Sequence, residues 1–336
     1  MLAHIVPIII ASGGVPIAAV RRWLTESTQP VNAVAATQAA IAIGDESLIW
    51  LALDHVRADA RCLAFEYLAP ELPDPLPVQL LNLRSDRGSR VRRALVKELS
   101  TRPHSDHLPV LMQLTRDKWS DAEPRYDEPD SNPIAREAVA ALAQFRPLPI
   151  ANGRELLELA KSTDDRELRR EALAAAAEHC SPAIRRDIWA IVGNKELGGW
   201  TRVDAVDALS QASFVEVDIV RSITTKRLMS LPAPLAASVT VLVGLHQSVA
   251  EAVRILERLG QSHAHRALLL LGVAVLENRD HAAAVDLLDL LDVDHPARRL
   301  LDEEEELLPG TVLDDLGDVR IRRHVQLWLS YRIAGA

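Results

Sequence analysis

Residues Asp86–Thr101, with the sequence DRGSRVRRALVKELST, predict one amphipathic helix preceded by a turn. Apolar side chains recur along this stretch at helical spacing, and charged side chains occupy the opposite side. The apolar set is Val91, Ala94, Leu95, Val96 and Leu99, and the charged set is Arg90, Arg93, Lys97 and Glu98. A helix of this kind is stable mainly through the packing of its apolar face, so it needs neighbouring helices.

Weaker copies of this stretch occur before and after it. Aligned on Val91, the copies begin at Ala60, Ala135, Leu168 or Arg169, and Val203. They follow one another at intervals of about 31, 44, 33 and 35 residues, a range typical of stacked supersecondary repeats. A second apolar segment precedes each copy, at residues 48–55, 77–83, 108–115, 155–161 and 184–192. The pattern therefore predicts a series of helical hairpins.

The repeat resembles the HEAT family of helical-hairpin repeats. In that family an Asp typically precedes the second helix, which opens with an apolar residue followed by Arg or Lys. Here Asp86 stands six residues before Arg92, and Asp130 stands six residues before Arg136, while Arg61 belongs to a looser match. The resemblance implies a ladder in which each Asp caps helix amides and each Arg bonds the Asp of a neighbouring turn.

This resemblance leads us to expect an all-α fold, a right-handed α-solenoid of about eight stacked antiparallel hairpins. We expect one solenoid over residues 1–336, with regular repeats over 15–212. Beyond residue 200 the motif weakens, because Gly198 and Asp204 fill the positions of Asp86 and Arg92. The other expected parts are an N-terminal cap segment at 1–14, an inserted acidic loop at 118–131, and divergent repeats with a C-terminal capping helix at 213–336.

The composition is consistent with helix-on-helix packing and limits the partners. Hydrophobic residues make up 48% of the 336 residues but aromatic residues only 4%, which favours closely packed helices over a sheet. The net charge of −9 argues against a main role in binding nucleic acid or an anionic membrane. Cys62 and Cys180 lie in different repeats, so we expect two buried thiols rather than a disulfide, and a cytoplasmic protein.

The apolar N-terminal segment, residues 1–23, lacks a basic leading region and is interrupted by proline and glycine. We expect it to form a short helix, a turn and the start of the first repeat. A signal peptide or membrane anchor is the alternative interpretation, although the apolar run is short for a spanning helix. No later segment is a membrane candidate.

The inserted loop carries two aromatic residues among carboxylates. Trp119 and Tyr126 lie between Asp121, Glu123, Asp127, Glu128 and Asp130. A long loop between tightly turned repeats is often functional, and exposed aromatics beside carboxylates could bind a basic partner segment. The alternative is a solvated acidic insertion whose Trp119 folds back on the adjacent helix.

The sequence contains none of the common catalytic or metal-binding motifs. GxSxG, the Walker-type phosphate loop, HExxH and CxxC are all absent. His104 and His107 have a spacing that can present two metal ligands on one helix face, but the segment SDH beside Pro103 is explained more simply as a helix cap. We therefore expect no catalytic residue, no cofactor and no bound metal.

Arginines gather near the openings of the second helices. For Arg61, Arg92 and Arg136 we favour the structural ladder. Arg90, Arg93 and Arg170 fit equally well into surface ion pairs or into a basic ribbon that receives an acidic peptide or phosphate groups. Together with Trp119, Tyr126 and Trp200, these three arginines are the candidate partner-binding residues.

The predicted function is a non-catalytic scaffold that binds another protein or peptide on the concave wall of second helices. One alternative is an enzyme similar to the HEAT-like DNA glycosylases, in which Trp189 and Trp200 with Asp187 or Asp204 would read a damaged base. Another alternative is a regulatory or sensor subunit of a bacterial defence or signalling complex.

Overall fold

A computed structural model describes residues 17–119, 132–223, 228 and 230–256 of the chain. The regular secondary structure of these residues consists of α-helices and short 3-10 helices, with no strand, which confirms the all-α prediction. The chain divides into two compact units. The first comprises residues 1–148 and 162–175, and the second comprises residues 149–161 and 176–336.

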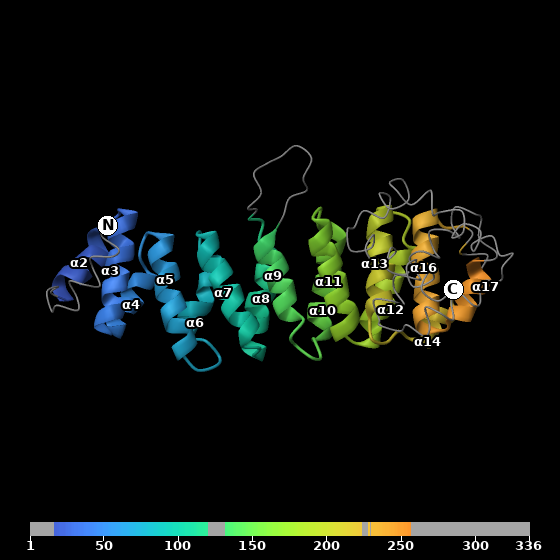
Figure 1. Ribbon diagram of the computed structural model, residues 1–336, viewed down its shortest axis with the longest axis horizontal. Coiled ribbons are helices and arrows are strands. Elements are labelled where there is room, and N and C mark those ends of the chain that lie inside the picture. The colour runs from blue at the N-terminus through green and yellow to red at the C-terminus, as the bar shows by residue number, and fades with distance from the viewer. Residues whose placement is uncertain (1–16, 120–131, 224–227, 229, 257–336) are drawn as a thin grey trace, which may run out of the picture. The chain divides into compact units, whose positions relative to one another are not determined.

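The helices of the first unit form two rows (Figure 1). One row contains α3 (Pro30–Ile43), α5 (Ala58–Leu68), α7 (Ser89–Thr101) and α9 (Pro133–Leu142), and each packs on the next. The other contains α2 (Ile17–Glu26), α4 (Glu46–Leu53), α6 (Val78–Leu81) and α8 (Leu108–Leu114). Three short 3-10 helices occur along the chain between α5 and α8: η1 (Ala69–Glu71), η2 (Asn82–Ser85) and η3 (Ser105–His107).

Helix α7 forms where the opening stretch predicts it. Its N-cap residue is Gly88, and Val91, Leu95, Val96 and Leu99 are buried. Ala94, which belongs to the apolar set in the sequence, is instead half-buried on the open side of the helix. Full burial of one Leu side chain contributes about 1.5–3 kcal/mol, so the buried face holds α7 against its neighbours.

The hairpin helices share one register, which the backbone hydrogen bonds define. Arg61, Arg92, Arg136, Arg169 and Arg202 each donate their backbone N–H to the carbonyl four residues earlier, on the residue just before the helix. The repeat anchors are therefore the residues before these arginines. The ambiguity between Leu168 and Arg169 is resolved in favour of Leu168. The alignment on Val203 was wrong by two residues, because the Gly198 carbonyl accepts from Arg202 as the Gly88 carbonyl accepts from Arg92.

Aligned on these arginines, the helices also show a common pattern of buried residues. In four of these helices the residue before the arginine is buried, and in three of the four further buried residues follow at intervals of four, one and three. They are Ala60, Ala64, Phe65 and Leu68 in α5, Val91, Leu95, Val96 and Leu99 in α7, and Leu168, Ala172, Leu173 and Ala176 in α11 (Arg166–His179). The recurring pattern in the sequence is thus the pattern of the core.

In the second unit, α12 (Pro182–Gly193) packs on α13 (Gly199–Gln211), α13 packs on α16 (Ala233–His246), and α16 packs on α17 (Val249–Leu256). Helix α14 (Val217–Arg221) also contacts α16. Residues of α10 (Ile150–Ser162) and α11 are divided between the two units. None of the helices in the described ranges is long and apolar enough to cross a membrane. The expected N-terminal cap at 1–14 and the C-terminal capping helix lie outside the described residues.

Candidate functional site

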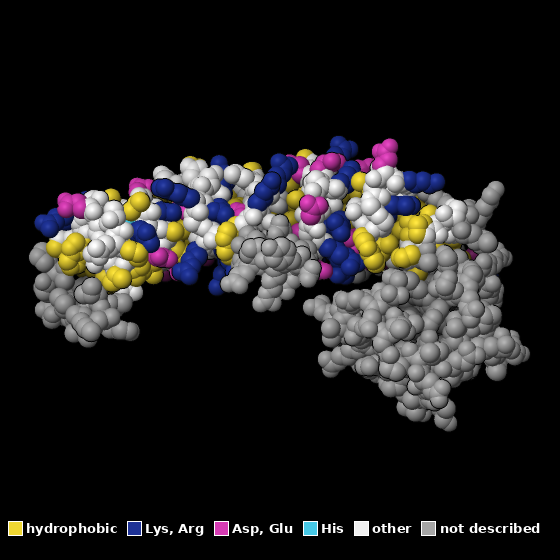
Figure 2. Space-filling model, turned by 90° about the horizontal axis from the view of Figure 1, so that it is seen from above, with side chains coloured by type: hydrophobic (Ala, Val, Ile, Leu, Met, Phe, Trp, Pro, Cys, Tyr) yellow, Lys and Arg dark blue, Asp and Glu magenta, His cyan; other side chains and the backbone are white. Residues whose placement is uncertain are grey.

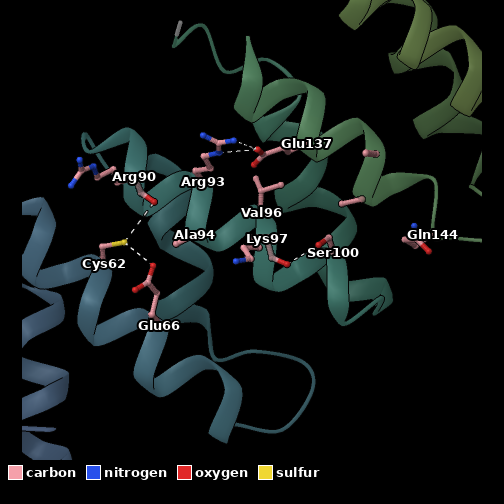
Figure 3. Close-up of a pocket in the computed structure, with 12 residues that line it drawn as sticks. Cys62, Glu66, Arg90, Arg93, Ala94, Val96, Lys97, Ser100, Glu137 and Gln144 are labelled. Carbon is pink, nitrogen blue, oxygen red and sulfur yellow. Dashed lines mark hydrogen bonds and ion pairs between the residues drawn. The ribbon is translucent and has the colours of Figure 1, made fainter. Parts of the chain in front are cut away.

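The first unit carries a groove on the open side of α5, α7 and α9, which we call the α7 groove (Figure 3). Its volume is about 750 Å³. Twelve residues line it: Cys62 and Glu66 from α5; Arg90, Arg93, Ala94, Val96, Lys97 and Ser100 from α7; and Glu137, Ala140, Ala141 and Gln144 from α9 and the turn after it. The volume is within the range of ligand pockets, which is about 300–1,000 Å³.

Short side chains create this hollow. Ala94 on α7 and Ala140 and Ala141 on α9 place single methyl groups where longer side chains would fill the space between the helices. The helices stay packed because their opposite faces carry the buried core, including Leu95 and Val139. The groove thus follows from a small-residue face on helices whose stability is provided elsewhere.

Charged side chains are ordered across the groove. The cations Arg90, Arg93 and Lys97 lie on the central helix, and the carboxylates Glu66 and Glu137 lie on the flanking helices (Figure 3). Arg93 Nε donates to Glu137 Oε1 at 2.7 Å, and both side chains are partly exposed. On the α5 side, Arg90 Nη1 contacts the Asp59 carboxylate at 3.2 Å. Lys97 is exposed and makes no ion pair with any described residue.

The thiol in the groove is not activated. The Cys62 Sγ lies 3.4 Å from Glu66 Oε1 and 3.8 Å from the Arg90 carbonyl oxygen, and it donates to both. Burial and the neighbouring Glu66 carboxylate raise the pKa of Cys62 to about 12. A thiolate is the reactive form of cysteine, so this residue is a poor nucleophile at neutral pH.

Next to the groove, at the loop end of the same helices, lies a set of buried ion pairs. Arg61 donates from Nε and Nη2 to the two carboxylate oxygens of Asp86, at 2.7 and 2.6 Å. Arg92 makes the same bidentate contact with the Asp117 carboxylate. Each arginine also donates to the carbonyl six residues before it, Arg61 to His55 and Arg92 to Asp86. Each arginine thus joins the start of its own helix to a carboxylate 25 residues further along the chain.

Asp117 was missed by the sequence pattern. Its Oδ1 accepts the backbone N–H of Trp119, as Asp86 Oδ1 accepts that of Gly88, so the two residues have equivalent roles. The pattern pointed to Asp130 because that residue stands six positions before Arg136. Asp130 lies outside the described residues. The inserted segment separates Asp117 from α9, which hides its role in a linear alignment, but its spacing of 25 residues from Arg92 equals that of Asp86 from Arg61.

Arg136, predicted to join the ladder, has a different type of partner. It donates to Glu171 Oε1 from Nε and Nη2 at 3.0 and 2.7 Å, and its side chain is 36% exposed, against 8% for Arg61. The residue directly before the arginine, Ala135, is buried in α9 as it is in α5 and α7. Arg136 therefore differs from Arg61 in the type of its partner and in its exposure.

His104 and His107 do not converge on a metal. The His107 ring is fully buried, its Nδ1 lies 2.9 Å from the Arg102 carbonyl oxygen, and its Nε2 accepts the Leu76 N–H at 3.2 Å. Both ring nitrogens of His107 are thus hydrogen-bonded to backbone groups. His104 Nδ1 accepts the backbone N–H of Asp106, which is the helix cap that the sequence favoured. No group of three or more potential metal ligands occurs within the described ranges.

The other candidate partner-binding residues do not line the α7 groove. Arg170 pairs with Glu167 at 3.3 Å. The Trp119 side chain is partly buried, and Tyr126 lies outside the described residues. Trp200, which is 49% exposed, belongs to the second unit. The structure thus brings Arg90 and Arg93 together, and adds Lys97, Glu66 and Glu137, which the sequence did not single out.

The second unit contains a buried ion pair that was also missed. Arg185 Nη2 lies 2.8 Å from Glu216 Oε1, with both side chains at least nine-tenths buried. Arg185 also donates to the carbonyls of Ala177 and Cys180, and its guanidinium lies 5.9 Å from the Phe214 ring centroid. These contacts fix the turns between helices, which is a structural role.

Two comparisons with known proteins found no match for the chain. No protein-family model matches the sequence, and no curated protein matches it.

Proposed function

We propose that this chain is a HEAT-like helical-repeat scaffold, without catalytic activity of its own, that binds a segment of another protein in the α7 groove. The observation that supports this proposal most strongly is the groove itself. It is an open hollow of about 750 Å³ that spans three neighbouring helices of one row, α5, α7 and α9, and its lining includes Ala94, Ala140 and Ala141. Such a surface accepts side chains from a partner without displacing any of the core.

The chemistry of the groove favours binding over catalysis. Its thiol has a pKa raised to about 12, and its ion pair between Arg93 and Glu137 is partly exposed to solvent. Catalytic groups usually need pKa values close to the working pH. Figure 2 shows Lys and Arg side chains interspersed with Asp and Glu side chains on the face in view, an arrangement that suits a protein surface better than a phosphate backbone.

Site-specific photo-crosslinking in the cells that produce the protein tests this proposal. A photoreactive residue at Ser100, which lines the groove, should form adducts with a polypeptide. The same residue at exposed Val217 in the second unit is the matched control and should not yield that adduct. Ala140→Trp should abolish the Ser100 adduct, because Ala140 is exposed and a large ring there fills the groove without entering the core.

Two results would contradict the proposal. One is a Ser100 adduct that persists unchanged in the Ala140→Trp variant while the variant remains folded. The other is a groove adduct that consists of nucleic acid rather than protein.

A further inference from the structure

We infer that the segment that binds in the α7 groove is acidic, and that its carboxylates are spaced to meet a row of cations along α7. This inference rests on the proposed function and adds the chemistry of the partner. It starts from the order of charges across the groove, which places cations on the central helix and carboxylates on both sides.

The three groove cations of α7 lie on one face of the helix. Arg90, Arg93 and Lys97 are separated by three and four residues, so their directions around the helix axis differ by no more than about 60°. The seven residue steps from Arg90 to Lys97 span about 10.5 Å along the axis.

The present partners of these cations are weak competitors for a bound carboxylate. The Arg90–Asp59 pair is 79% and 39% exposed, and the Arg93–Glu137 pair is 49% and 36% exposed. Exposed ion pairs of this kind contribute little to folding stability, so their cations can be shared with a ligand at small cost. Lys97 has no carboxylate partner among the described residues, so we infer that it is the strongest single site for an incoming acidic side chain.

The carboxylates at the edges select against a uniform polyanion. Glu66 faces the groove from α5 and Glu137 from α9, so a phosphate backbone lying across α7 would meet negative charge on both sides (Figure 3). An acidic helix avoids this repulsion, because its carboxylates can lie in one row above α7 while its other faces are neutral or basic. Carboxylates at positions i, i+3 or i+4, and i+7 would repeat the spacing of the cations.

Fluorescence anisotropy with the full chain tests the inference. The probe is a labelled alanine-based peptide with Glu at i, i+4 and i+7, and the comparison probes are the same peptide with Gln and a single-stranded DNA oligonucleotide. The Glu peptide should bind, more weakly as salt is added, and the Gln peptide should not. Lys97→Glu should weaken binding of the Glu peptide by about tenfold or more.

Two further variants give this experiment its controls. Lys97→Arg keeps the positive charge and should retain binding. Lys195→Glu makes the same change in charge at an exposed lysine of the second unit and should leave the affinity unchanged. Lys97 is exposed, so its variants should unfold at the temperature of the unmodified chain, which confirms that a loss of affinity is local.

Several outcomes would overturn the inference. They are no binding of the Glu peptide, equal binding of the Gln peptide, equal loss of affinity in Lys97→Glu and Lys195→Glu, or DNA binding that equals peptide binding and depends on Lys97. If groove crosslinking nevertheless captures a polypeptide, the proposed scaffold function stands and only the acidic character of its partner is wrong.

Discussion

Arg92 and Arg93 are consecutive residues of α7, but they belong to two different regions of the molecule. Arg92 lies in the buried ladder and binds Asp117, whose side chain is 7% exposed. Arg93 lies in the α7 groove and binds Glu137, whose side chain is 36% exposed. The residue types and the contact distances are alike. The comparison teaches that burial, and not the presence of an ion pair, decides which arginines hold the fold and which remain available to a partner.

The largest expected effect is at the ladder. Asp86→Ala leaves Arg61 buried without its carboxylate and removes the acceptor of the Gly88 N–H. Breaking one side of a buried pair typically costs about 3–5 kcal/mol, so we expect a loss of this size in the free energy of unfolding, measured in urea. The matched control is Asp59→Ala, which removes the exposed partner of Arg90 and should cost less than about 1 kcal/mol. Equal losses in the two variants would remove the distinction between ladder and groove.

A smaller effect is expected where α5 and α7 approach each other beside the ladder. A Cβ at Gly88 would stand 2.5 Å from the Ala58 Cβ, so the helices would have to move apart. Gly88→Ala should lower the free energy of unfolding by about 1–3 kcal/mol, the usual cost of overpacking. Gly199, the first residue of α13, is the control, because a Cβ there meets nothing within 4 Å. Gly199→Ala should be neutral or stabilising, and thermal unfolding of both variants compares them.

The third prediction extends the comparison to histidines. Burial lowers the pKa of His107 below its ordinary value of 6.5, although Asp74 nearby opposes this effect. The neutral ring therefore stabilises the fold fully above pH 6.5, and that contribution is lost as the pH falls through the lowered pKa. The slope for one such group is at most about 1.4 kcal/mol per pH unit.

Urea unfolding between pH 7.5 and 5 measures this dependence. His107→Gln should be less stable at pH 7.5 and should lose less stability on acidification than the unmodified chain. Part of the slope will remain, because burial also lowers the pKa values of His55 and His246. An unchanged slope in His107→Gln would show that this ring does not titrate with folding.

The helices could be predicted from the sequence because apolar residues recur at helical spacing, and in α5, α7 and α11 at the same intervals. The sequence of α7 alone predicted a helix within Asp86–Thr101 and an apolar set of five residues, of which all but Ala94 are buried. The opening arginines were also visible in the sequence, but their alignment at Gly198–Arg202 required the backbone hydrogen bonds. Helical periodicity determines which residues face the core, whereas the register between distant repeats depends on turns whose lengths vary.

The groove could be predicted only in part. Arg90 and Arg93 were candidates because they lie near the opening of a second helix, on its charged side. Glu137 was not, because it lies 44 residues from Arg93 and the insertion breaks the regular interval. The hollow itself depends on Ala140 and Ala141, and alanine in a helix predicts close packing as readily as an open surface. Which of the two occurs is decided by the neighbouring helix and not by the local sequence.

The smallest expected effect on stability is also the sharpest test of the difference between the two regions. Arg93→Glu and Glu137→Arg together exchange the ends of the groove pair and keep the net charge. Because both side chains are partly solvated, the exchange should change the free energy of unfolding by less than about 1 kcal/mol. It nevertheless moves a cation from α7 to α9 and places a carboxylate in the row that faces the acidic segment. Binding of the Glu peptide should therefore weaken while stability is preserved. A large loss of stability would show that the groove pair supports the fold as the ladder does, and unchanged binding would show that the order of charges along α7 does not select the partner.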